Sequence, residues 1–226
     1  MTDIIETAED DFVNVYGDAS YFPPTGTIGV AWIIATHDNP LSPNAYFERY
    51  KLPKQDTPQD RRDITNPAEL AAIYFGIMSV PIDKKVRVHC DCKDVLQKLH
   101  HTIQTNNFLD NTTGAEKAMI TKIVDEIKKR PDVIIIYAHE TPERESNPFT
   151  RYYMAHAHNA AADGSGANSK ITVPDPYAPP PTTLPKSKPH DSSCALEIIE
   201  WDNDPSNDEP FEYPNHGDQK PRPAGF

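Results

Sequence analysis

The stretch Val86-Arg-Val-His-Cys-Asp-Cys-Lys-Asp-Val95 joins a short predicted β-strand, Val86 to Cys90, to a predicted helix that starts at Asp94. Asp91 stands between the two elements. An aspartate at the end of an apolar strand contributes little to packing, but its oxygens suit a hard cation. Asp91 is therefore a candidate metal ligand, and the elements around it predict the fold.

The chain before residue 173 alternates between strand-like and helix-like patterns, which is typical of a mixed α/β domain. Strands are predicted over Phe12 to Tyr16, Thr27 to Ala35, Tyr46 to Leu52, Val86 to Cys90 and Val133 to Tyr137. Helices are predicted from Asn66-Pro67 onward, and over Asp94 to Ile103, Ala115 to Lys129 and Tyr152 to Ala162. Asn66 is expected to cap the first helix, with proline in its first turn. We expect an α/β fold with a mixed five-stranded sheet flanked by helices, in which the first three strands form an antiparallel meander.

The composition divides the 226-residue chain into a domain, residues 1–172, and a tail, residues 173–226. Twelve of the 23 prolines lie in the tail, whose 10 acidic and 4 basic residues carry half of the net charge of −12. Such a segment buries too little apolar surface to offset its ordering entropy, so we expect it to be largely disordered. One apolar island, Cys194 to Trp201, either docks a protein partner or packs on the domain without a further role.

The sequence favours an intracellular protein, cytoplasmic or nuclear. No apolar run approaches the roughly 18 residues of a membrane-spanning helix, and the N-terminal residues are acidic where a secretion signal is basic. Three cysteines are too few for a disulfide scaffold. The negative net charge argues against a nucleic-acid partner without excluding one, because acids gathered around bound cations would be neutralised.

Three more acidic residues occupy positions of interest. Asp18 follows the predicted first strand, Glu69 lies in the first turn expected after Asn66, and Asp163 ends the last predicted helix. Glu69 could simply complement the helix dipole, whereas Asp163 stands where the dipole disfavours a negative charge, which favours a functional role. Each acid alone is more often a surface residue, and the combination is what indicates a site.

Four short motifs around these acids resemble those of the ribonuclease H family. They are Asp18-Ala-Ser20, Asn66-Pro-Ala-Glu69-Leu70, Asp91-Cys-Lys-Asp-Val95 and Asn159-Ala-Ala-Ala-Asp163. They occur in the family's order, on the element types that the family uses, over residues 10 to 170 or so. Each motif is weak alone, but four in order are fairly specific.

The resemblance implies a ribonuclease H-like domain that acts as an endoribonuclease on the RNA strand of RNA–DNA hybrids. The four acids would hold two Mg²⁺ or Mn²⁺ ions, with Asp18 bridging them, Glu69 and Asp91 on one side and Asp163 on the other. The resemblance also implies a role in proton transfer or product release for His139, with His156 and His158 as rivals. Substrate contacts are implied for Asn66, Ser20, Lys93 and Asn159, and Asn66 would contact a 2′-hydroxyl.

Three positions depart from the family pattern. Ala19 replaces a glycine, Lys93 replaces a glutamine that contacts nucleic acid, and Pro67 replaces a basic residue. These departures leave substrate preference more open than metal binding. Two alternatives therefore stand beside the hybrid-cutting enzyme: a catalytically weak relative that serves as a scaffold or interaction module, and a nuclease of the same fold that acts on DNA.

Two other features have a simpler interpretation. Cys90 and Cys92 are interpreted as small buried hydrophobes rather than as metal ligands. The basic segment Lys117 to Arg130 is either a solvated helix face or a modest substrate-binding surface.

Overall fold

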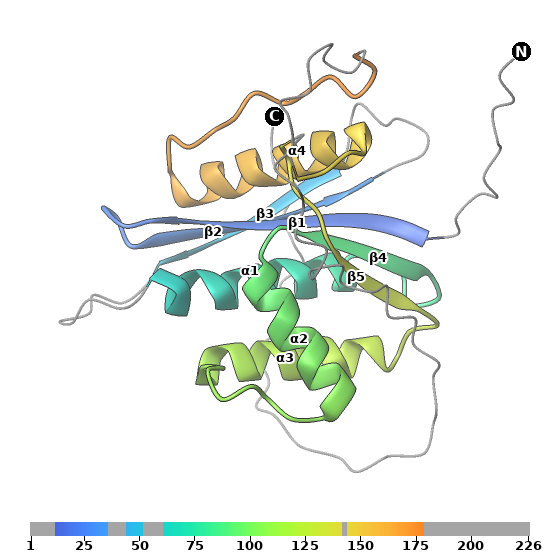
Figure 1. Ribbon diagram of the computed structural model, residues 1–226. Helices are drawn as coiled ribbons and strands as arrows, with labels where there is room; N and C mark the ends of the chain where they lie inside the picture. Colours follow the sequence, from blue (N-terminus) through green and yellow to red (C-terminus); the bar gives the residue numbers. More distant parts are fainter. Residues whose placement is uncertain (1–11, 36–43, 52–60, 142–143, 179–226) are drawn as a thin grey trace, which may run out of the picture.

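The computed structural model describes residues 12–35, 44–51, 61–141 and 144–178, which form one sheet with helices on both faces (Figure 1). The strands are β1 (Phe12–Phe22), β2 (Thr27–Ile34), β3 (Asn44–Lys51), β4 (Lys85–Cys90) and β5 (Val133–Tyr137). The helices are α1 (Arg61–Met78), α2 (Lys93–Thr105), α3 (Gly114–Ile127) and α4 (Pro148–Ser165). The predicted element order and fold class are confirmed. The apolar island of residues 194–201 lies outside the described residues.

The five strands follow the spatial order β3-β2-β1-β4-β5. β1 pairs antiparallel with β2, and β2 with β3, which confirms the expected meander. The turn from β1 to β2 contains Gly26 at φ 63°, a left-handed conformation that glycine adopts without cost. β4 pairs parallel with β1 on one side and with β5 on the other. The carboxyl ends of β1, β4 and β5 therefore lie along the same edge of the sheet.

Helix α4 covers one face of the sheet, and α1, α2 and α3 lie on the opposite face (Figure 1). The core on the three-helix side includes Val15, Trp32, Leu70 and Ile73, all fully buried. Trp32 also donates a 2.8 Å hydrogen bond from Nε1 to Ser79 Oγ, so the polar atom of its side chain is satisfied. None of the helices in the described ranges combines the length and apolar character that crossing a bilayer requires.

Helix α4 approaches β2 so closely that a side chain at Gly29 would not fit. A Cβ atom built there would lie 2.0 Å from the Ala161 carbonyl oxygen and 2.5 Å from the Ser165 nitrogen. Arg49 of β3 donates 2.6 and 3.1 Å hydrogen bonds to the carbonyl oxygens of Gly164 and Asp163, at the helix end where carbonyl groups lose their intrahelical partners. These contacts fix the last turns of α4 over the sheet.

The predicted start of the first helix was wrong. α1 begins at Arg61, so Asn66 lies inside it and does not cap it, and Pro67 is also internal. The Asn66 side chain is buried between neighbouring helices. It bonds to Asp94 of α2 and Glu116 of α3 and not to its own backbone. Glu69 consequently lies in the third turn, where the helix dipole no longer accounts for it.

Candidate active site

Three carboxylates come together from three elements. The paired residues Gly17 of β1 and Cys90 of β4 are directly followed by Asp18 and Asp91. Helix α1 packs against β1 at Gly17, where a Cβ atom would lie 3.2 Å from Ala72 Cβ. Glu69 stands one turn before Ala72 on the same helix. The parallel pairing and this close packing therefore bring Asp18, Glu69 and Asp91 to one place.

Glu69 and Asp91 lie in an environment that disfavours their charge, and Asp18 is buried beside them. Glu69 is 7% exposed and Asp18 is 4% exposed. Burial raises the pKa of Glu69 well above its usual value, and the charges of Asp18 and Asp91 raise it further. Burial, followed by the charges of Asp18 and Glu140, raises the pKa of Asp91 to about 8. Glu69 Oε2 is buried and finds no hydrogen-bond partner within the described part of the chain.

These residues fit a hard divalent cation. A buried carboxylate oxygen without a donor is costly, and a bound cation would supply the missing interaction. The donor set is rich in oxygen, as Mg²⁺ and Mn²⁺ prefer. Ligand atoms of Glu69, Cys90 and Asp91 lie within 4.8 Å of one another. Burial raises the pKa of the Cys90 thiol far above its usual value, so it packs as a neutral core residue, as predicted, and leaves the carboxylates as ligands.

Asp18 is held by two hydrogen bonds. Its Oδ1 accepts from the Ala19 backbone N–H at 2.7 Å, and its Oδ2 lies 3.0 Å from Nδ1 of His158 on α4. The other ring nitrogen of His158 lies 2.9 Å from the Ser169 carbonyl oxygen. Since both partners of the ring are acceptors, both nitrogens donate. The hydrogen bond to Asp18 is the main cause that raises the pKa of His158 to about 9.

Asp163 is paired with a lysine at the C-terminal end of α4. Its side chain is 55% exposed and forms a 2.7 Å ion pair with Lys170. The Lys170 ammonium also explains why a carboxylate is tolerated at the C-terminal end of α4, so the unfavourable dipole is no longer a sign of function.

His139 and Glu140 lie beside Asp91, just beyond β5. Ligand atoms of these three residues fall within 4.8 Å of one another. Arg144 Nη1 lies 3.1 Å from His139 Nε2. Nδ1 of the same ring accepts a 3.2 Å hydrogen bond from the Thr141 backbone N–H and lies 3.0 Å from Glu140 Oε2. Burial lowers the pKa of His139, which favours the neutral ring.

Of the two rival histidines, one reaches the acids. His158 binds Asp18, whereas His156 packs edge-on against the ring of Tyr152 at a centroid distance of 4.5 Å. The structure therefore places His139 at Asp91 and His158 at Asp18. Neither Glu140 nor the His158 contact was predicted; the position of Glu140, three residues beyond an apolar strand, was the available signal.

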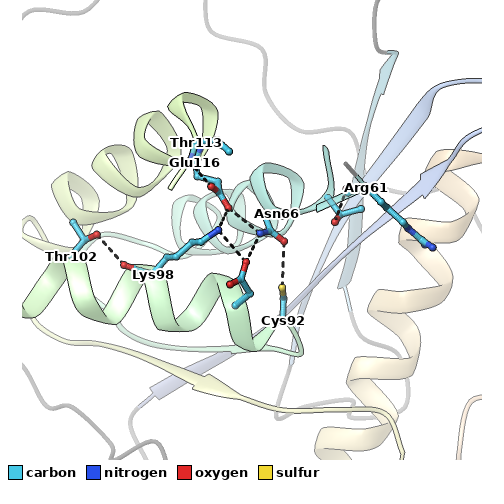
Figure 2. Close-up of polar contacts among 9 residues, drawn as sticks. Arg61, Asn66, Cys92, Lys98, Thr102, Thr113 and Glu116 are labelled. Atoms are coloured by element: carbon cyan, nitrogen blue, oxygen red, sulfur yellow. Dashed lines mark hydrogen bonds and ion pairs between the residues drawn. The ribbon is translucent and has the colours of Figure 1, made fainter. Parts of the chain in front are cut away.

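Asn66 is the centre of a buried polar network that joins α1, α2 and α3 (Figure 2). Its Nδ2 donates to Asp94 Oδ2 at 2.6 Å and to Glu116 Oε1 at 2.9 Å. Lys98 donates to the same Glu116 oxygen at 2.6 Å and forms a 3.0 Å ion pair with Asp94. Cys92 Sγ lies 3.9 Å from Asn66 Oδ1. Both amide protons are therefore engaged inside the protein, which leaves none for a substrate hydroxyl in this conformation.

The three other residues expected to contact substrate lie apart from one another. Ser20 Oγ accepts a 3.1 Å hydrogen bond from Ser165 Oγ. Asn159 binds the backbone of Ile171 twice, at 2.8 and 2.9 Å, and so holds the segment after α4. Lys93 is exposed at the start of α2, with its Nζ 4.8 Å from the centre of the Tyr137 ring. Lys93 carries a positive charge and lies two residues after Asp91 in the sequence.

The sequence matches no protein-family model and no curated protein sequence. Among solved structures, ribonuclease H1 from the halophilic archaeon Halobacterium salinarum NRC-1 is 13% identical, with a TM-score of 0.43 over 67% of this chain and 98% of that one. LC11-RNase H1, isolated from compost by a metagenomic approach, is 14% identical, with a TM-score of 0.47 over 70% and 97% of the two chains. LC11-RNase H1 in complex with an RNA/DNA hybrid is 13% identical, with a TM-score of 0.40 over 55% and 83%.

Likeness at this identity concerns the fold alone. The mixed five-stranded sheet flanked by helices is the fold class expected from the sequence. The domain has a ribonuclease H-like fold. In this ribonuclease H-like domain, the charges of Asp18 and Asp91 act on Glu69, and Asp163 is paired with Lys170.

Proposed function

We propose that this protein is a metal-dependent endonuclease of the ribonuclease H type, which hydrolyses the RNA strand of RNA–DNA hybrids. The observation that carries the proposal is the buried Glu69 oxygen without a donor, between two further carboxylates. A folded protein keeps such an arrangement at a cost, and strongly perturbed carboxyl groups are concentrated at functional sites. Bound Mg²⁺ or Mn²⁺ would lift that cost.

Asp18, Glu69 and Asp91 would hold the cations. The family resemblance implies that two cations bind. The chemistry that bound ions would supply there is activation of a water for attack on the phosphodiester and stabilisation of the leaving 3′ oxygen. Asp18 is presented in a fixed orientation, because Ala19 N–H and His158 each hold one of its oxygens. His139, next to Asp91, is placed to take or give a proton, and the resemblance assigns this role to it.

The choice of an RNA–DNA hybrid as the proposed substrate rests on the four sequence motifs. Lys93 stands two residues after Asp91 and is exposed, so its ammonium can meet a phosphate close to the carboxylates. Ser20 lies two residues beyond Asp18 on β1 and would contact a 2′-hydroxyl in place of Asn66, whose amide is engaged internally. Recognition of this hydroxyl would distinguish RNA from DNA.

The test compares cleavage of a labelled RNA–DNA hybrid with that of the matching DNA and RNA duplexes, in Mg²⁺, in Mn²⁺ and in EDTA. The variants are Asp18→Asn and Asp91→Asn. Asp110→Asn is the matched control, because Asp110 is an exposed aspartate in the loop before α3. We expect metal-dependent cutting of the RNA strand with 5′-phosphate products, a loss of at least about a hundredfold in the two site variants, and normal activity in the control.

Each alternative predicts a distinct result. Preferred cutting of duplex DNA, still abolished by Asp91→Asn, would make the protein a DNA nuclease of the same fold. Absence of cleavage on every substrate, although the protein is folded, would favour the scaffold or interaction module, with the 194–201 segment as the place to seek its partner.

A further inference from the structure

A buried lysine anchors the polar network between α1, α2 and α3 (Figure 2). Lys98 is 4% exposed, and its Nζ donates to Glu116 Oε1 at 2.6 Å and pairs with Asp94 Oδ2 at 3.0 Å. Burial acts to lower the pKa of Lys98, but hydrogen bonds to Glu116 and then to Asp94 outweigh it and leave that pKa raised. The ammonium therefore stays charged inside the protein and holds two carboxylates in place.

The same two carboxylates hold Asn66. Its Nδ2 donates to Asp94 Oδ2 at 2.6 Å and to Glu116 Oε1 at 2.9 Å, and Lys98 binds both of these acceptors. An asparagine amide that donates both of its protons is held in one orientation, and its Oδ1 then lies 3.9 Å from Cys92 Sγ. Lys98 thus fixes the side chain that joins α1 to the start of α2.

Both ends of this link adjoin candidate cation ligands. On α1, Asn66 precedes Glu69 by three residues, so the two buried side chains lie on the same face of the helix. At the other end of the link, Cys92 directly follows Asp91 and is the N-cap residue of α2. Glu69 and Asp91 come from different elements, and the contact of Asn66 with Cys92 ties those elements together next to both acids.

We propose that Lys98 is a positioning residue of the cation site, which acts through Asn66 to set the separation between the Glu69 and Asp91 carboxylates. The charge of Asp91 acts against that of Glu69, so the two carboxylates repel each other when no cation lies between them. A link behind them that resists this repulsion keeps the ligands close, and ligands ordered in advance bind a cation more tightly. This inference rests on the proposed function in one respect: both require that Glu69 and Asp91 bind a divalent cation.

The test measures Mn²⁺ binding to the full-length chain by isothermal titration calorimetry, without substrate, at a temperature where circular dichroism shows each variant to be folded. Asn66→Ala breaks the link and leaves the ion pairs of Lys98 in place. The double variant Lys98→Met/Glu116→Met removes the buried cation together with its carboxylate, so neither charge is left unpaired in the interior. We expect each variant to weaken Mn²⁺ binding about threefold to tenfold, somewhat less than the loss of a group bonded directly to a metal ligand.

Three further variants separate positioning from general stability. Lys129→Met removes a surface ion pair with Glu126 and should leave the Mn²⁺ affinity unchanged. Lys98→Arg keeps a positive charge with N–H donors, so it should retain more affinity than the double variant. Asp91→Asn, which removes a ligand itself, should abolish binding.

The outcomes distinguish this inference from the proposed function. Unchanged affinity in Asn66→Ala or in the double variant, with binding abolished by Asp91→Asn, would overturn the positioning role and leave the proposed function intact. Equal weakening in Lys129→Met would show that affinity follows overall stability, and would also overturn the positioning role. A wild-type chain that binds no Mn²⁺ would overturn the positioning role and the proposed metal site together.

Discussion

Asp18 and Asp91 each directly follow one member of a register pair, Gly17 and Cys90, on two neighbouring parallel strands. This relationship places two acidic side chains at the same level of the sheet, although they lie far apart in the sequence. Glu69 completes the cluster from α1, which can approach because residue 17 is a glycine. The energetic consequence is a buried site that favours a bound cation over an empty, charged state.

Replacement of Asp91 by asparagine should make the metal-free protein more stable. Burial, and then the charge of Asp18, raises the pKa of Asp91 to about 8. At about pH 8.5, which is above this pKa, most Asp91 carboxyls are ionised although they are buried. Removal of this charge should raise the free energy of unfolding by roughly 1–2 kcal/mol. Millimolar Mg²⁺ should stabilise the wild type and not the variant. Urea unfolding with and without Mg²⁺ measures both effects, and a destabilised variant in EDTA would contradict the account.

The buried histidine of β4 should make stability depend on pH. Burial lowers the pKa of His89 from 6.5 to about 3, and its ring stacks on Tyr16 at a centroid distance of 4.2 Å. Between pH 6.5 and about pH 3, His89 binds a proton in the unfolded chain but not in the folded one. The free energy of unfolding therefore decreases as the pH falls through this range. From pH 7 to pH 4 this loss amounts to roughly 3 kcal/mol. Unfolding of His89→Phe should lack this part of the slope, and parallel curves for the two proteins would refute the prediction.

The ion pair between Lys98 and Glu116 should be needed for stability. Both side chains are at most 5% exposed, and Lys98 Nζ lies 2.6 Å from Glu116 Oε1. Burial acts to raise the pKa of Glu116, but hydrogen bonds from Lys98 and then Thr113 outweigh it and leave that pKa lowered. Lys98→Met leaves the carboxylate buried without its cation, so we expect a loss of about 3–5 kcal/mol in denaturant unfolding.

A matched surface pair provides the control for Lys98. Lys129 forms a 3.2 Å ion pair with Glu126, but its side chain is 63% exposed. Lys129→Met should therefore cost less than about 1 kcal/mol, because solvent screens the pair. Equal losses in the two methionine variants would show that burial does not set the strength of these ion pairs.

Two glycine-to-alanine substitutions should have opposite effects. Gly29→Ala forces a methyl group against the backbone of α4, so we expect a loss of about 3 kcal/mol or more. Gly114 begins α3 and has nothing within 4 Å of an added Cβ atom. Gly114→Ala should therefore stabilise by about 0.4–1 kcal/mol, through the unfolded state. Thermal unfolding measures both changes, and a stable Gly29→Ala protein would mean that α4 does not approach β2 as closely as described.

The sequence predicted the sheet well because strands alternate locally and the element order restricts their pairing. The pairing of β1 with β4, and hence the meeting of Asp18 with Asp91, could not be predicted from the sequence, because no local pattern shows which parallel strands are neighbours. The start of α1 was missed because Asn66 and Pro67 form a good local cap signal, while the buried contacts of Asn66 with Asp94 and Glu116 are not visible in a local pattern.

The limits of the site prediction have the same physical origin. Asp163 has the spacing of the family motif from Asn159, but spacing along a helix does not reveal the competing Lys170, which returns from beyond the helix end. His158 and Glu140 carry no motif of their own, and their proximity to Asp18 and Asp91 depends on how α4 and β5 pack on the sheet.

The most direct test of the central claim is an anomalous difference map at the manganese absorption edge from crystals of the full-length protein grown with Mn²⁺. We expect a peak at about 2.1–2.3 Å from carboxylate oxygens of Asp18, Glu69 and Asp91. Well-ordered side chains at these three positions without a peak between them, at millimolar Mn²⁺, would contradict it.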